Sequence, residues 1–375
     1  MRSYDVLIIG GGIAGVSLAY ELAADRAVGV LEREPALAAH ATGRSAATFV
    51  ESLGDGQIRG LTRASRVFYE SPPLPFGQQL LRPMALLLTA VPGRAEVLQR
   101  MQAEIRIGSP DVRLVDDKEV RELNPLLRPG YAELALFEPD AMEIDVHAVH
   151  QGYVQGLRQR NGIIRTRAKV VSLVRRGPVW TVTDAAGESY EAPVVVNAAG
   201  AWVDGVARLA GAAPIGVRPL RRTIFLVSGP GDVTGVPLTA DVDEEFYFKP
   251  EGGHLLCSPA DETPMAPCDA RPDEVAIARG LDAINEATVL NVRHVRNSWA
   301  GLRSFAPDGH PVVGFDERAD GLFWFAGQGG FGVQTAPALA RLGAAVLRGE
   351  AVPADVAAAG VSLDLVGAGR FAVAG

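Results

Sequence analysis

Apolar runs and helix-like repeats alternate along the chain, and the arrangement is clearest at its beginning. Val6–Ile9 is a short apolar run of the kind that forms a parallel strand buried on both faces. A glycine-rich turn at 10–15 follows, and the pattern then predicts a helix over 16–24 and a second strand at Val28–Leu31. A strand, a turn, a helix and a strand in this order predict a βαβ unit, the start of a parallel sheet.

The rest of the chain contains two further classes of segment. The pattern predicts helices over 56–70, 94–106, 117–124, 146–161, 273–287 and 333–347. Apolar or alternating runs predict strands at 84–90, 134–137, 170–174, 180–182, 194–196, 216–228, 245–257 and 322–326. Asp145 is the expected N-cap of the helix over 146–161 and Gly162 its C-terminal stop, whereas 351–375, rich in small residues, is predicted to be loose.

Segments typical of βαβ units alternate along the chain with segments typical of antiparallel sheet. The first kind lies at the start, near 150–212 and at the end, and Val170 marks the expected return of the chain to the first sheet. This alternation predicts an α/β protein of two interleaved domains. A Rossmann-type nucleotide-binding domain comprises 1–80, 146–214 and 311–375, and an α+β substrate domain built on an antiparallel sheet comprises 81–145 and 215–310.

The glycine-rich turn fits the GxGxxG fingerprint of dinucleotide-binding βαβ units. Gly10 permits the tight turn, Gly12 lets a pyrophosphate approach the backbone, and Gly15 lets the helix pack closely on the strand. The free N–H groups and the positive dipole end of the helix face the phosphates. Glu32, which ends the second strand, is placed to accept hydrogen bonds from a ribose hydroxyl. Because all these parts are in register, we favour dinucleotide binding over a purely structural turn.

The composition narrows the classes of function. Of 375 residues, 48% are hydrophobic and 21% charged, which is ordinary for a globular protein, and the net charge of −8 argues against a nucleic-acid partner. Cys257 and Cys268 are too few for a disulfide framework. Only His147 and His150 have a spacing that a metal site could use, and no third ligand is visible, so no metal site is predicted. The chain has no GxSxG elbow, which argues against hydrolysis.

The sequence also bears on location. Its start lacks the pattern of a signal peptide, and no stretch of about 20 residues is uninterruptedly apolar. We therefore expect a cytoplasmic protein without a transmembrane segment, and contact with the inner face of a membrane stays open.

Glycine-rich features are spread over the whole chain, at 10–15, 43, 200 and 327–332. This distribution suits a long, extended cofactor such as FAD, whose flavin end lies far from its adenine end. The segment 327–332 immediately precedes a predicted helix, so its N–H groups would face the negative charge that develops near flavin N1 and the C2 carbonyl on reduction. The alternative is a glycine turn that packs against the sheet.

Two arginines and a tyrosine are candidates for substrate binding. Arg303 lies in an apolar run, where a guanidinium needs an anionic partner. Arg221 and Arg222 begin an apolar strand whose alternation puts one of them on the face of the buried positions, and Tyr247 lies in another strand. If the three converge, they form a clamp for a substrate carboxylate. Pairing of the arginines with acids such as Asp243 or Glu244 is an equally good interpretation of the pattern alone.

Seven longer stretches are far more specific than the glycine fingerprint. On them the chain resembles the glycine oxidase/D-amino acid oxidase family of FAD-dependent enzymes over nearly its whole length, and within it the bacterial D-arginine dehydrogenases most. The stretches are VLEREPALAAHATGRSAA (30–47), DVHAVHQGY (145–153), VVNAAGAW (195–202), RPLRR (218–222), EFYFKP (245–250), WAGLRSF (299–305) and GQGGFGVQT (327–335).

The resemblance implies roles for individual residues. Arg222, Arg303 and Tyr247 match the side chains that hold the substrate α-carboxylate, and Gly332 matches a backbone carbonyl that receives the amino group. Neither cysteine lies by the matched flavin segments, so FAD is expected to be bound non-covalently, with His40 left open as an attachment point. The residues that match FAD contacts are Gly10, Gly12, Ile13, Ala14, Gly15, Glu32, Arg33, Thr42, Arg44, Ser45, Ala46, Ala47, Val170, Gly200, Gly301, Gln328, Gly329, Gly330, Gly332 and Val333.

The chain departs from the D-arginine dehydrogenases in the substrate pocket. Thr48 replaces an active-site histidine, Val50 and Leu53 replace a threonine and a tyrosine, and Met84 replaces the glutamate for the guanidinium. A cationic side chain would be desolvated there without a partner. The resemblance and these departures imply oxidative deamination of a D-amino acid with an apolar or uncharged side chain. Hydride transfer from Cα to flavin N5 would give an imino acid, then a 2-oxo acid and ammonia.

Two further interpretations stay open at this point. The same scaffold would serve a secondary amine, such as an N-alkyl amino acid or an opine, or a 2-hydroxy acid. A non-catalytic flavin-binding protein is the other, supported by the changed pocket residues and opposed by the retained clamp. The electron acceptor, O₂ or a quinone-type carrier, is left open as well.

Overall fold

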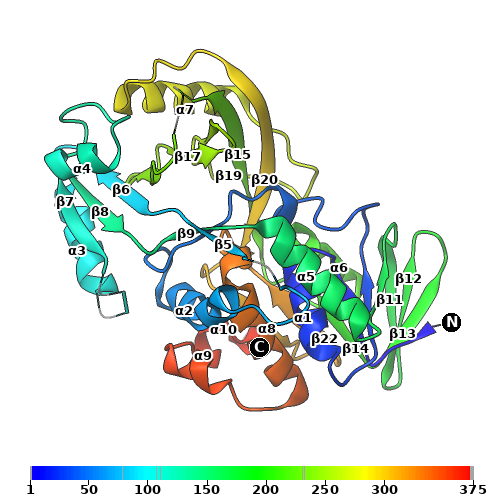
Figure 1. Cartoon of the computed structure of the whole chain (residues 1–375). Helices are drawn as coiled ribbons and strands as arrows, with labels where there is room; N and C mark the ends of the chain where they lie inside the picture. Colours follow the sequence, from blue (N-terminus) through cyan, green and yellow to red (C-terminus); the bar gives the residue numbers. More distant parts are fainter. Residues whose placement is uncertain are drawn as a thin grey trace.

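The first domain is built on a six-stranded sheet. The computed structural model describes residues 2–77, 79–106, 108–109, 111–229, 231 and 233–371. In this sheet the first five strands are parallel and β21 is an antiparallel edge, which confirms the predicted Rossmann-type α/β arrangement (Figure 1). The order is β10 (Ile163–Arg165), β3 (Val28–Leu31), β2 (Val6–Ile9), β14 (Val194–Asn197), β22 (Leu322–Ala326) and β21 (Val312–Phe315).

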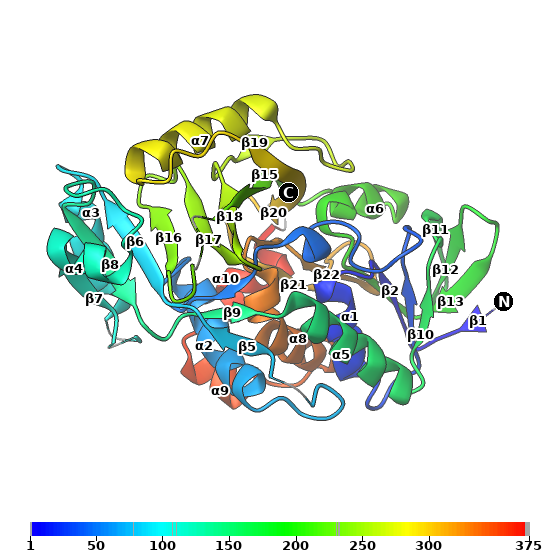
Figure 2. The same ribbon diagram turned by 45° about the horizontal axis from the view of Figure 1, so that its top comes forward.

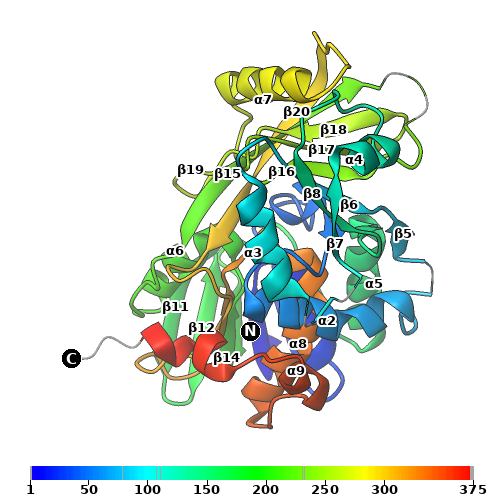
Figure 3. The same ribbon diagram turned by 90° about the vertical axis from the view of Figure 1, so that its left-hand side faces the viewer.

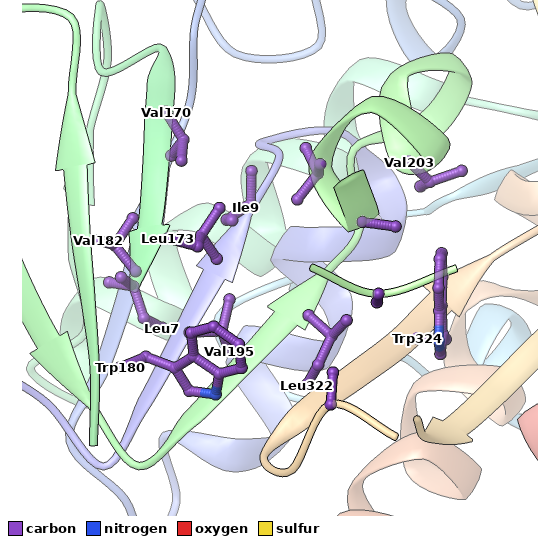
Figure 4. Close-up of a cluster of buried hydrophobic side chains, with 14 of the residues drawn as sticks. Leu7, Ile9, Val170, Leu173, Trp180, Val182, Val195, Val203, Leu322 and Trp324 are labelled. Atoms are coloured by element: carbon purple, nitrogen blue, oxygen red, sulfur yellow. The ribbon is translucent and has the colours of Figure 1, made fainter. Parts of the chain in front are cut away.

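Both faces of this sheet are covered, which explains why β2 and β22 are apolar at every position and β14 at every position but its last, Asn197. Ile8 faces the core under α1 (Ile13–Leu22) and α8 (Gly332–Arg348), while Leu7 faces the opposite core. Figure 4 shows that second core, which also contains side chains from a separate four-stranded sheet and from α6 (Val203–Leu209). The four-stranded sheet has the order β1 (Arg2–Ser3), β13 (Ser189–Ala192), β12 (Val179–Asp184) and β11 (Val170–Arg176).

The second domain is a ten-stranded, mostly antiparallel sheet, which confirms the predicted class of the substrate domain. Helix α7 (Glu274–Ala287) packs on one face through Ile284 and Ala287, and Figure 3 shows it at the end of the molecule opposite α8. Helices α3 (Ala95–Ile105) and α4 (Asp117–Leu123) flank the far strands. The sheet order is β23 (Gln328–Gly329), β20 (Val295–Phe305), β15 (Arg218–Ser228), β18 (His254–Ser258), β17 (Tyr247–Glu251), β16 (Leu238–Asp241), β6 (Leu86–Ala90), β8 (Leu134–Glu138) and β7 (Arg113–Asp116), with β19 (Thr263–Pro264) paired to β15.

A three-stranded sheet connects the two parts. It has the order β4 (Thr48–Phe49), β9 (Met142–Ile144) and β5 (Leu81–Pro83), and Figure 2 shows β9 and β5 beside α2 (Gly56–Glu70) and α5 (Val146–Gln159). The large sheets divide along the predicted segments except at β23, which carries residues of the third nucleotide-binding segment into the substrate sheet. The domain boundaries themselves stay a prediction.

Three local expectations are wrong. Helix α5 starts after its Asp145 cap as predicted, but Asn161, with φ of 63°, takes the left-handed position expected of Gly162. Val170 does not return to the first sheet, because β10 makes that return and β11 belongs to the four-stranded sheet. The segment expected to be loose forms α9 (Ala354–Ala358), α10 (Leu363–Val366) and a 3-10 turn at Ala368–Phe371.

The error at the C-terminus has a physical reason. Val356, Val361 and Val366 are buried in the core beneath α8. Tertiary packing therefore stabilises short helices there, although the segment is rich in small residues and has no clear helical pattern. Residues 372–375 lie outside the described residues. No helix among the described residues combines the length and apolar character needed to cross a bilayer.

Candidate active site

One long cavity of about 430 Å³ runs from the glycine turn to the strands of the substrate sheet. Gly10, Gly12 and Glu32 line one end of it, and Arg222, Tyr247 and Arg303 line the other. All the residues predicted to contact FAD line this cavity, apart from Gly15 and Ala47. The fold therefore brings together segments separated by up to the length of the chain, as an extended cofactor requires.

The glycine turn is shaped by steric limits. Gly10 has a φ of 116°, and a Cβ there would lie 2.3 Å from the carbonyl oxygen of Ala198. Gly15 lies behind the turn, where a Cβ would be 1.9 Å from the carbonyl oxygen of Gly10. Gly15 thus acts by close packing and has no contact with the cavity, while Gly12 lines it directly.

Glu32 organises the same end of the cavity. Its carboxylate accepts hydrogen bonds from the backbone N–H of Gly11 at 2.8 Å and of Glu34 at 2.7 Å. The side chain lies in the cavity wall and is mostly buried. A carboxylate has about four acceptor positions, so two remain to receive ribose hydroxyls as the sequence predicted.

His150 is a contact of the glycine turn that sequence reasoning did not find. It lies on α5, is buried, and its Nε2 is 3.0 Å from the carbonyl oxygen of Gly11, so we assign the proton to Nε2. Burial lowers the pKa of this imidazole. The sequence signal, a histidine three residues from His147, pointed only to a surface or packing role.

The holoprotein should lose thermal stability as the pH falls below 6.5 because of His150. Its neutral ring is favoured in the folded state, so its contribution is complete above the ordinary pKa of 6.5 and is lost as the pH falls towards the lowered folded value. We expect the decrease in Tm between roughly pH 7.5 and 5.5 to be smaller in His150→Gln than in the parent. The exposed His147→Gln is the matched control. Equal decreases in all three proteins would contradict the assignment.

The middle of the cavity is held by Arg44. Its Nη1 donates to the carbonyl oxygens of Ala270 at 3.1 Å and Ala300 at 3.0 Å, its Nε donates to Ala39, and Nη2 contacts Asp269. These bonds join the first domain to the substrate domain. The guanidinium is therefore engaged by protein groups, and the part of Arg44 that lines the cavity contributes packing.

Trp202 is a second wall residue that was not assigned a role from sequence. The guanidinium carbon of Arg33 lies 4.7 Å from the centre of its ring, and the His40 ring lies at the same centroid distance. Arg33, His40 and Trp202 all line the cavity. Glu34, which follows Arg33, accepts a hydrogen bond from His40 Nε2 at 3.0 Å. His40 is therefore held beside Glu34 and Trp202 in the cavity wall.

The second glycine segment shapes the wall nearest the clamp. Gly329 has a φ of 55° and pairs with Ser304 of β20, after which α8 begins at Gly332. Gln328 lines the cavity, and its buried Nε2 has no hydrogen-bond partner among the described residues. An unpaired buried donor indicates that a ligand acceptor belongs there, as the carbonyl-rich edge of a flavin would supply.

The first turn of α8 is stabilised by a hydrogen bond from a side chain of another helix. Pro337 has no N–H and so leaves the carbonyl of Val333 without its helical partner. The hydroxyl of the buried Tyr69, on α2, donates to that carbonyl. This bond fixes the helix turn that bounds the cavity at Gly332 and Val333.

The predicted clamp residues converge at the far end of the cavity. Arg222 lies opposite Gly301 in the pairing of β15 with β20, and Arg303 stands two positions along, so both arginines share one face. The guanidinium carbon of Arg222 is 5.9 Å from the ring centre of Tyr247. Because Gly301 has no side chain, nothing at that position separates Arg222 from Arg303 on this face.

The guanidinium of Arg303 is perturbed by its surroundings at this end of the cavity. Desolvation in the cavity and the charge of Arg222 lower the pKa of Arg303, while Tyr247 and Glu262 raise it. An arginine stays protonated at neutral pH even so. Glu262, for which the sequence offered no signal, approaches both arginines: its Oε1 is 2.8 Å from Arg222 Nη2 and 4.0 Å from Arg303 Nη1.

None of the four predicted pocket residues is among the described residues that line this cavity. Val50 is buried, and Leu53, Met84 and Tyr247 pack against it in a small apolar cluster, which we call the apolar wall. The cluster also contains Leu86, Ala141 and Leu238. Thr48 is separate, on β4 opposite Glu143. Tyr247 thus belongs both to the apolar wall and to the predicted clamp.

The remaining predicted contact, Ala47, also lies outside this cavity. It lines a second cavity of about 270 Å³ together with Ser45 and Ala46, which line both. Lys249 and Glu143 face this second space, and the Lys249 ammonium bonds to Glu143 and, at 2.7 Å, to Glu251. Among the described residues no cluster of side chains forms a metal site.

Comparison with known proteins agrees with this geometry. Mitochondrial dimethylglycine dehydrogenase of Mus musculus is 25% identical over 354 residues, which cover 88% of this chain and 40% of that protein. Glycine oxidase from Geobacillus kaustophilus has a similar structure, with a TM-score of 0.83, 22% identity and coverage of 94% of this chain and 96% of that one. L-alpha-glycerophosphate oxidase from Mycoplasma pneumoniae, solved with FAD bound, has a TM-score of 0.82 at 19% identity and covers 93% and 95%.

The dimethylglycine dehydrogenases are longer proteins, of which this chain spans between 30% and 41%. A family model, described as FAD dependent oxidoreductase (DAO), matches residues 5–346. FAD is the cofactor of that family, and the cradle from Gly10 to Gly332 fits it. Since the match covers most of its length, the chain belongs to the DAO family of FAD dependent oxidoreductases.

Proposed function

We propose that the protein oxidises the Cα–N bond of an amino acid, and that it prefers D-amino acids with apolar or uncharged side chains. The observation that carries the proposal is the convergence of Arg222, Tyr247 and Arg303 at the end of the cofactor cavity next to the glycine segment 327–332. Two guanidinium groups beside an aromatic hydroxyl suit a carboxylate. The closer likeness to bacterial D-arginine dehydrogenases stays a prediction from sequence.

The residues of the chain act mainly by positioning. Arg222 and Arg303 would bind the α-carboxylate, Tyr247 would donate to it, and the carbonyl of Gly332 would receive the neutral amine. When bound, FAD supplies a flavin ring that accepts the hydride from Cα, and the imino acid is then hydrolysed to a 2-oxo acid and ammonia. No protein base with a special pKa is required.

The preference for uncharged side chains follows from the apolar wall. Leu53 and Met84 are half-buried next to Tyr247, so they present apolar surface beside the substrate site. The nearby carboxylate of Glu138 accepts the backbone N–H groups of Glu51 at 2.8 Å and Ser52 at 3.2 Å. These bonds direct the Glu138 carboxylate towards the backbone, so a cationic side chain placed at the wall would be desolvated among apolar groups.

Anaerobic bleaching of the flavin tests the proposal. We expect D-Leu, D-Met and D-Phe to reduce the enzyme with a kcat/KM at least about tenfold higher than D-Arg or D-Lys, because one unpaired charge costs more than 1.4 kcal/mol. Met84→Glu should raise the ratio of D-Arg to D-Leu activity by about tenfold, and Met84→Gln is its uncharged control. Faster reduction by D-Arg in the parent enzyme would overturn the preference.

A second candidate is oxidation of an N-alkyl amino acid. The match to dimethylglycine dehydrogenases favours it, and the clamp would hold such a carboxylate equally well. Sarcosine and dimethylglycine therefore belong in the same bleaching panel, with a 2-hydroxy acid. Bleaching by a secondary or tertiary amine alone would replace the first proposal. A yellow protein that none of these compounds bleaches would indicate a non-catalytic role.

A further inference from the structure

Glu262 is a carboxylate already built into the proposed clamp, and the inference drawn from it rests on that clamp. It lies in the loop between β18 and β19, and its side chain is 40% exposed. Its Oε1 accepts from Arg222 Nη2 at 2.8 Å and lies 4.0 Å from Arg303 Nη1. The described residues that line the cavity do not include it, so it flanks the ligand space.

Arg222 is held along one edge only. Its Nε donates to the carbonyl oxygen of Asp261 at 3.0 Å, and Nη2 donates to Glu262. Among the described residues Nη1 forms no hydrogen bond, and the side chain lines the cavity. The two loop residues therefore fix the outer edge of the guanidinium and leave the edge with Nη1 for a ligand carboxylate.

The loop is rigidly attached to β15, so the position of Glu262 is determined by the fold. The side chain of Asp261 is 9% exposed, and its carboxylate accepts from the N–H of Thr223 at 2.6 Å and from the Nε of Arg221 at 3.1 Å. Ser258 Oγ donates to the carbonyl of Thr223 at 2.7 Å. Successive acids thus meet successive arginines, Asp261 with Arg221 and Glu262 with Arg222.

We propose that Glu262 is a specificity residue, which reduces the clamp from two positive charges to a net charge of one and so restricts it to ligands with a single carboxylate. A monocarboxylate then neutralises the site. The second carboxylate of a short dicarboxylate would approach Glu262 and be repelled, because like charges brought together in a poorly solvated site are strongly unfavourable. Glu262 is not among the residues predicted to contact FAD, so this role is separate from cofactor binding.

The test uses competitive acids with the FAD-loaded enzyme. Propionate and succinate are titrated into the parent, Glu262→Gln and Glu274→Gln proteins, and binding is followed by the visible flavin spectrum. Glutamine retains an acceptor for Arg222 Nη2 and removes only the charge. Glu274, an exposed residue in the first turn of α7, provides the same change of net charge at a residue outside the clamp.

We expect Glu262→Gln to tighten succinate binding by about tenfold or more, while propionate changes by less than about threefold and Glu274→Gln resembles the parent. Glu262→Asp, which keeps the charge, should retain the parent ratio of the two dissociation constants. A purely structural role would move both acids together, so an unchanged ratio in Glu262→Gln overturns the inference. Failure of both acids to perturb the parent flavin would instead overturn the clamp itself, and the proposed function with it.

Discussion

Replacing Arg303 with methionine should raise the KM for the amino acid by about 100-fold or more while the protein stays yellow. Two charge-assisted hydrogen bonds to a carboxylate contribute about 1.5–3 kcal/mol each, so losing both removes most of the binding energy of a small substrate. Arg303 stands on the same face as Arg222 at the end of the cavity, and methionine fills a similar volume without a charge. Steady-state kinetics with the best substrate of the bleaching panel provides the measurement.

Two controls separate substrate binding from general damage. Arg303→Lys keeps the positive charge and loses the planar fork, so it should fall between the parent and Arg303→Met. The FAD content and visible spectrum of each variant should match the parent, because Arg303 contacts the ligand end of the cavity. A KM within twofold of the parent value in Arg303→Met would show that the clamp does not bind the substrate.

Replacing Gly15 with alanine should abolish most FAD binding and lower the Tm by about 5 °C or more. The added Cβ would lie 1.9 Å from the carbonyl oxygen of Gly10, a distance at which the turn must shift. Because the atom it meets is backbone, no side-chain rotation relieves the overlap. We expect a colourless protein, with bound FAD below about a tenth of the parent content, measured by absorbance after gel filtration.

A glycine in open space provides the matched control. Gly56 is the first residue of α2, and a Cβ there meets no atom within 4 Å. Gly56→Ala should therefore bind FAD normally and gain up to about 0.5–1 kcal/mol in unfolding free energy. Full FAD content in Gly15→Ala would mean that the turn tolerates a side chain, contrary to the steric argument.

Much of the fold is predictable because its signals are local. The turn from Gly10 to Gly15, the capping by Asp145 and the uninterrupted apolar strand at Val6–Ile9 each depend on neighbours within a few residues. The end of α5, where Asn161 takes the left-handed conformation, and the short helices after Pro353 were predicted less well. In the short helices, tertiary contacts such as burial of Val356 outweigh weak local preferences.

The candidate site was predicted in parts. The arginines at 222 and 303 were identified from charges in apolar runs and from a family resemblance, and the structure places them on one face. Glu262 and His150 had no usable signal. Their contacts, with Arg222 and with the carbonyl of Gly11, cross 40 and 139 positions of the sequence.

The amino-acid sequence by itself determined the βαβ nucleotide fold, the two kinds of sheet and the identity of the positive groups, since these follow from side-chain periodicity and from the steric needs of single residues. Only the tertiary structure decided which groups meet. It packed Val50 and Met84 into a wall beside the cavity, and it brought Glu262 against the two arginines. The reason is physical: hydrophobicity and backbone sterics act over short stretches of chain, whereas charge pairing and cavity shape depend on the register between strands that are remote in sequence.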